Sequence, residues 1–120
     1  TSKRADIKIK KMYIYNVTAN VEQSIHDEWL IWIETHIQEV LETGRFSNAK
    51  LTEVLVEEEF GARTYSIQYA AQTREDLDNY YKFEAPKLQQ DGLKKFGDKV
   101  LTFRTELKLI NEFYPSAVSN

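Results

Sequence analysis

Residues 24–46, SIHDEWLIWIETHIQEVLETGRF, contain both histidines and both tryptophans of the 120-residue chain. At about 100° per residue, a helix over this stretch places Trp29, Trp32 and His36 on one apolar stripe, with His26 at its margin. A histidine on such a stripe is usually a core residue bonded to a backbone carbonyl or a tyrosine hydroxyl. The functional alternative is a general base in a cleft, because imidazole titrates near neutral pH. We expect the core role for His36 and keep the base as the alternative; the tryptophans are interpreted as packing residues.

The other residues of a site around His36 would have to come from the strands of a sheet. Tyrosine hydroxyls beside an imidazole suit proton abstraction from an acidic carbon, and amide or guanidinium groups can orient a substrate. The candidate ligand contacts are Tyr15, Tyr69, Asn16, Gln68 and Arg104. No metal site is expected, because histidines ten positions apart point about 80° apart on a helix and the chain has no cysteine. No cofactor is expected either, since a glycine-rich phosphate loop is missing from the sequence.

Hydrophobic periodicity and capping residues divide the chain into alternating strands and helices. The predicted strands cover residues 12–21, 49–59, 63–71 and 99–110, and the predicted helices cover 24–43, 73–84 and 86–96. Ser24 and Thr73 are the predicted N-caps, and Pro86 suits the first turn of the last helical segment. The order is the split βαβ of a ferredoxin-like βαββαβ sandwich, an α+β fold with helices on one face of an antiparallel sheet.

Helices on one face leave the other face of the sheet open to water or a partner. In the last strand we expect Leu101, Phe103, Leu107 and Leu109 to face the helices, and Thr102, Arg104, Glu106 and Lys108 to face outward. With Asn16, Thr18, Ser66 and Gln68, the open face would then be polar. One interpretation is a solvated face; the other is that two sheets stack in a symmetric homodimer and close a dimeric α/β barrel.

The first strand also resembles the first-strand motif of RNA-recognition domains through MYIYNV. That function would require Tyr13 and Tyr65 on the open face, whereas the core interpretation turns them toward the helices. Five basic residues and one acid give the first eleven residues a charge of +4. Because the net charge of the whole chain is −3, the remaining residues carry −7. Because an acidic body repels phosphate, we expect no nucleic-acid partner and keep RNA binding as a remote alternative.

Length and composition indicate one globular domain. Residues 1–11 are predicted to be a flexible basic extension, 12–110 the ferredoxin-like domain and 111–120 a C-terminal tail. No apolar run reaches the length of a membrane span and no signal-peptide pattern opens the chain, so we expect a cytoplasmic protein without membrane contact.

Three segments together resemble an uncharacterised family of short bacterial proteins, known mainly from Bacteroidetes and described as a domain of unknown function. They are YNVTANVEQSIHDEWLIWIETHIQEVLETGRF, TYSIQY and GLKKFGDKVLTFRTEL. The resemblance runs from about Met12 to about Ile110. It implies a ferredoxin-like fold of the dimeric α/β barrel type and transfers no catalytic residue.

The sequence does not name a reaction. Its best functional interpretation is a small dimeric module that binds a small molecule in a cleft between helix and sheet or inside a barrel. The alternative is a cofactor-independent enzyme of the dimeric α/β barrel type, resembling monooxygenases or isomerases, with His36 as its base. Fold alone does not decide between the two.

Overall fold

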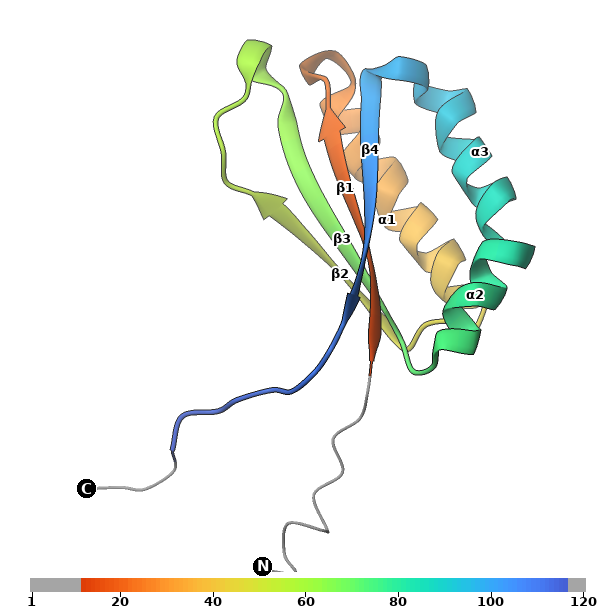
Figure 1. The fold of residues 1–120 in the computed structure, drawn as a ribbon. Helices are drawn as coiled ribbons and strands as arrows, with labels where there is room; N and C mark the ends of the chain where they lie inside the picture. Colours follow the sequence, from red (N-terminus) through yellow and green to blue (C-terminus); the bar gives the residue numbers. More distant parts are fainter. Residues whose placement is uncertain (1–11, 117–120) are drawn as a thin grey trace, which may run out of the picture.

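The computed structural model describes residues 12–116. Four antiparallel strands form one sheet in the order β2-β3-β1-β4, and the helices cover one of its faces (Figure 1). In chain order the elements are β1 (Tyr13–Val21), η2 (Gln23–Ile25), α1 (His26–Glu42), β2 (Asn48–Val54), η3 (Glu59–Gly61), β3 (Arg63–Ala71), α2 (Arg74–Phe83), α3 (Ala85–Phe96), η4 (Gly97–Lys99) and β4 (Val100–Lys108). The predicted ferredoxin-like α+β fold is therefore confirmed.

The two central strands turn their aromatic and small apolar residues toward the helices. Tyr15 lies opposite Tyr69 and Ala19 opposite Tyr65 in the β1·β3 register, and all four are buried. Directly opposed residues of antiparallel strands point to the same face, so the predicted orientation of β1 and β3 is confirmed. Their rings join a cluster with α2, in which the Phe46 ring lies 4.9 Å from that of Tyr80.

The orientation predicted for β4 is wrong. Its register with β1 places Thr102 opposite Ala19, Arg104 opposite Val17 and Glu106 opposite Tyr15, so these polar residues face the helices. The apolar set faces outward, where Leu101, Phe103 and Leu107 are 53%, 64% and 43% exposed. The prediction follows the usual rule that the more apolar side of a strand covers the core. In β4 the more apolar side lies on the open face instead.

One of the two predicted N-caps is present in the structure. The Thr73 hydroxyl accepts a 3.0 Å hydrogen bond from the backbone N–H of Asp76 and caps α2 as expected. Ser24 does not cap α1, because it lies within the 3₁₀ turn η2 and donates its hydroxyl to Glu22 instead. Pro86 lies in the first turn of α3, as predicted.

The second strand is shorter than predicted, since β2 ends at Val54 and not at residue 59. The chain then passes through η3, where Phe60 and Gly61 both have positive φ values of 59° and 75°. Residues 1–11, the predicted basic extension, and residues 117–120 lie outside the described residues. Within residues 12–116, no helix combines the length and the apolar character that crossing a membrane would need.

Candidate functional site

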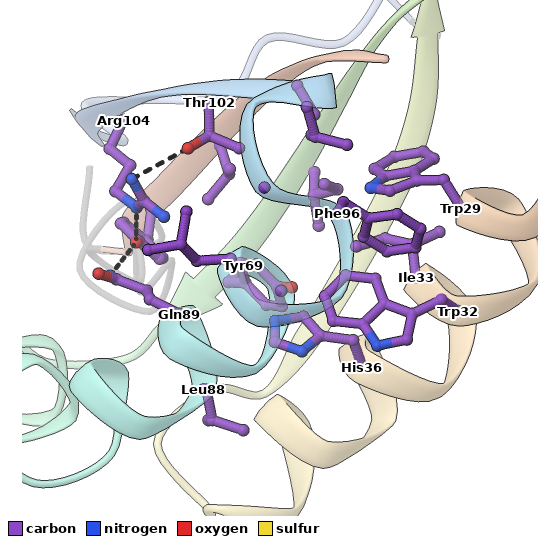
Figure 2. Close-up of a pocket in the computed structure, with 18 of the residues that line it drawn as sticks. Trp29, Trp32, Ile33, His36, Tyr69, Leu88, Gln89, Phe96, Thr102 and Arg104 are labelled. Carbon is purple, nitrogen blue, oxygen red and sulfur yellow. Dashed lines mark hydrogen bonds between the residues drawn. The ribbon is translucent and has the colours of Figure 1, made fainter. Parts of the chain in front are cut away.

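A cavity of about 300 Å³ lies between α1, α3 and the helix-facing side of the sheet (Figure 2). Its walls come from β1 and β3 at the base, from α1 and α3 at the sides, and from β4 at one end. The volume is at the small end of the range for ligand pockets, about 300–1,000 Å³. None of the residues that line it is Asp or Glu.

One end of the cavity is aromatic. The His36 imidazole stacks on the Trp32 indole, with ring centroids 4.5 Å apart and planes 20° apart, and Phe96 meets the same indole edge-on at 5.3 Å. Gly92 of α3 allows this approach, because a Cβ added there would lie 3.0 Å from Cη2 of Trp32. The fully buried Trp29 completes this wall, so both tryptophans of the chain line the cavity.

His36 is electrostatically unusual within this wall. Burial lowers its pKa below the ordinary value, an effect that the nearby carboxylates of Glu39 and Asp91 partly oppose. Its Nδ1 has no hydrogen-bond partner. Among the buried side-chain nitrogen and oxygen atoms of residues 12–116, it alone lacks one. Because the pKa is lowered, the ring is neutral at pH 7 and retains one donor and one acceptor nitrogen.

The other end of the cavity is rich in hydrogen-bond donors. Arg104 donates from Nε to the Tyr15 hydroxyl at 2.9 Å and from Nη1 to the Thr102 hydroxyl at 3.2 Å. Gln89 of α3 approaches the same Tyr15 oxygen at 3.4 Å. Figure 2 shows Arg104, Thr102 and Gln89 together at this end, away from the Trp32 and His36 stack. The cavity thus has an apolar aromatic end and a cationic polar end.

Two buried tyrosines, Tyr69 of β3 and Tyr80 of α2, also line the cavity. Burial and the neighbouring phenols raise the pKa of Tyr69 well above its usual range, and burial does the same for Tyr80. Both hydroxyls therefore stay protonated at any physiological pH and remain available as hydrogen-bond donors.

The structure brings four of the six predicted site residues together. His36, Tyr15, Tyr69 and Arg104 all line the cavity. Asn16 and Gln68 do not, because they lie opposite each other on the open face of the sheet. There Asn16 accepts a 2.6 Å hydrogen bond from the Ser66 hydroxyl and donates to Thr18 at 3.3 Å. Both amides could meet a ligand only on the far side of the sheet from His36.

The two histidines exchange the roles expected from the sequence. His26, predicted at the margin of the helix, is buried and hydrogen-bonds through Nε2 to the Tyr65 hydroxyl. His36 was expected to be the satisfied core histidine, but it is only half-buried and its Nδ1 has no partner. A helical projection cannot make this distinction, since the partner of His26 comes from β3, 39 residues away.

Several cavity residues were not predicted from the sequence. Gln89, Gly92 and Phe96 come from α3, and Thr102 comes from β4. The isolated glycine within PKLQQDGLKKF was a usable signal, because a glycine inside a helix often marks a close approach. Thr102 shares a strand face with Arg104, so placing that face correctly would have identified it.

Two further observations concern a metal site and the RNA interpretation. Across residues 12–116, no three His, Cys, Asp or Glu side chains gather in a way that could hold a metal ion. The RNA interpretation required Tyr13 and Tyr65 on the open face. Tyr65 is buried toward the helices, and Tyr13 lies opposite the buried Ala71 on that same side.

Several solved structures are similar to this chain at low sequence identity. A dimeric ferredoxin-like protein from an uncultured marine organism superposes with a TM-score of 0.66 at 7% identity, covering 86% of this chain and 99% of that chain. A PII-like signalling protein from Thermus thermophilus gives a TM-score of 0.45 at 10% identity, over 85% of this chain and 94% of that chain. A de novo designed protein with a ferredoxin fold also gives 0.45 at 17% identity, over 93% and 96% of the two chains. The first of these likenesses supports the ferredoxin-like fold.

No curated protein matches the sequence significantly. Residues 12–110 match the sequence profile of a family described as a domain of unknown function. These limits agree with the extent of the resemblance noted in the sequence, and they enclose every residue that lines the cavity. The chain therefore belongs to the family Domain of unknown function (DUF4286).

Proposed function

We propose that this protein is a small-molecule-binding module whose ligand occupies the cavity between α1, α3 and the sheet. The observation that carries the proposal is the cavity itself, in which an aromatic wall and a set of convergent polar groups face the same 300 Å³ space. Mostly apolar pockets with a few placed polar groups are the usual form of ligand sites. The bacterial origin and the cytoplasmic location expected from the sequence stay predictions.

A thermal-shift screen with a filled-cavity variant tests this proposal. Val17 lines the cavity, so Val17→Phe would fill part of it, whereas Val54→Phe makes the same substitution at the far edge of the sheet on the open face. Compounds that stabilise the wild type should also stabilise Val54→Phe and should fail with Val17→Phe. Hits that stabilise all three proteins equally would place binding elsewhere and contradict the proposal.

The same proposal includes a homodimer formed through the open face. Leu101, Phe103 and Leu107 are exposed there, and Ile14 lies directly opposite Leu107 on the neighbouring strand. Exposed apolar patches of this kind are typical of interaction sites. The marine protein of the same fold is described as dimeric, which supports a second copy as the partner. Stacked sheets would enclose Asn16 and Gln68 in a barrel interior, where a ligand could meet them.

An enzymatic role for His36 is the second candidate function, and its neutral, half-buried ring at the cavity wall favours it. A neutral imidazole can accept a proton from an acidic carbon of a bound compound. Solvent deuterium incorporation into a bound hit, followed by NMR, would detect such a step. Exchange that is catalysed by the wild type and lost in His36→Gln would support the enzyme, and equal exchange in both would exclude His36 as the base.

A further inference from the structure

Arg104 differs in its charge partners from the other arginines in the described part of the chain. Arg45 pairs with Glu84, Arg63 with Glu53, and Arg74 with Glu106 and Asp78. Among residues 12–116, Arg104 alone of the arginines has no carboxylate partner. It is also the arginine that lines the cavity, and no Asp or Glu is among the lining residues.

Hydrogen-bond donors at this end of the cavity exceed the acceptors. A guanidinium has five N–H donors, and Arg104 uses Nε on Tyr15 and Nη1 on Thr102. The Tyr15 hydroxyl accepts from Arg104 and Gln89, so its own proton is left to donate. A carboxylate is an acceptor-only group that takes two such donors side by side, and a guanidinium fits it in a bidentate pair.

We propose that the ligand is a flat aromatic monocarboxylate whose anionic group binds Arg104 and Tyr15 and whose ring lies against Trp32 and His36. This inference rests on the proposed small-molecule function and adds the chemical class of the ligand. The stacked indole and imidazole present an aromatic surface, against which a second ring packs favourably. The size of the cavity suits one ring with a short side chain, and Figure 2 shows the cationic and aromatic groups at opposite ends.

Three matched probes test the charge of the ligand. Cinnamate, cinnamamide and cinnamylamine share one ring and side chain and differ in bearing an anion, a neutral amide or a cation. Isothermal titration at pH 7 should show that cinnamate binds about 10- to 100-fold more tightly than the amide, the usual effect of a charge-assisted hydrogen bond. The amine should bind most weakly, because it would lie beside the guanidinium.

Variants of two cations on β4 then identify the group responsible. In Arg104→Gln the advantage of cinnamate over cinnamamide should disappear, while Arg104→Lys should keep part of it through the remaining charge. Lys108→Gln removes the same charge from the same strand outside the cavity and should leave both affinities unchanged. Circular dichroism of each variant confirms that the fold is intact.

The outcomes separate this inference from the proposed function. Equal affinities of the three probes, or a preference for cinnamate that survives Arg104→Gln, would overturn the anion assignment and leave the cavity as a ligand site. The anion assignment also fails if the thermal-shift screen finds only neutral or cationic compounds that Val17→Phe rejects. No binding of the probes together with a screen without hits would overturn both.

Discussion

His36 is a half-buried titratable residue of α1. Burial lowers its pKa, so the unfolded chain takes up this proton at a higher pH than the folded protein does. Its contribution to stability is therefore complete above the ordinary histidine pKa of about 6.5 and declines as the pH falls below that value toward the lowered pKa.

We predict that the free energy of unfolding of the wild type falls faster than that of His36→Gln as the pH is lowered from 7.5 to 5. Denaturant melts of both proteins at a series of pH values measure this difference, and the carboxylates contribute equally to both. Parallel curves would show that the His36 proton is not coupled to folding.

We predict that the Trp32 ring disfavours any larger residue at position 92. An alanine in a helix is ordinarily about 1 kcal/mol more favourable than a glycine, but here its Cβ would lie 3.0 Å from the indole. We therefore expect Gly92→Ala to give no gain in the wild type and a gain of about 0.5–1 kcal/mol in a Trp32→Phe background. A double-mutant cycle by chemical denaturation measures this coupling; equal effects in the two backgrounds would contradict it.

Residues whose environment follows from one local pattern could be placed from the sequence. Tyr15 and Tyr69 belong to the aromatic sides of two central strands, and His36 lies on an apolar helical stripe, so all three could be placed near the core. Whether a histidine finds a partner depends on contacts across the fold. His26 meets Tyr65 from β3, and no spacing within the helix predicts that contact.

Among the elements, the two predicted caps separate clearly in the structure. Thr73 bonds the backbone of Asp76, whereas Ser24 bonds only the side chain of Glu22. We expect Thr73→Ala to cost about 1 kcal/mol of unfolding free energy and Ser24→Ala less than about 0.5 kcal/mol, as for an ordinary surface position. Equilibrium unfolding in urea measures the loss of unfolding free energy in each variant. Equal losses would contradict a stabilising role for the Thr73 cap.

Strand β4 shows why an element can be found correctly and still be placed the wrong way round. Its alternation is regular, so its existence and limits were predictable. Which side faces the helices was not, because the outer side carries Leu101, Phe103 and Leu107, while the inner side carries the polar groups that line the cavity. A strand whose helix-facing side is polar and lines a cavity, and whose outer side is apolar, has the reverse of the usual pattern.

For the molecule as a whole, the exposed apolar residues of β4 on the open face lead to a prediction of the oligomeric state. Light scattering at micromolar concentration should give twice the chain mass of 14.1 kDa. Phe103→Asp should shift the protein to the monomer, since a charge on that face would have to be buried. Ile31→Asp, at an exposed apolar position on α1, is the control and should leave the dimer intact. A wild-type monomer, or a dimer insensitive to Phe103→Asp, would contradict the stacked-sheet arrangement.

We infer that the cavity between α1, α3 and the sheet binds a ligand. Because the two tryptophans of the chain both line this cavity, a ¹H–¹⁵N correlation spectrum contains two indole signals that report on it directly. We predict that a compound from the thermal-shift screen shifts both indole signals saturably, together with backbone amides of α1 and α3. Unchanged indole signals, with shifts confined to the side-chain amides of Asn16 and Gln68 on the open face, would place the site between two sheets and contradict the claim.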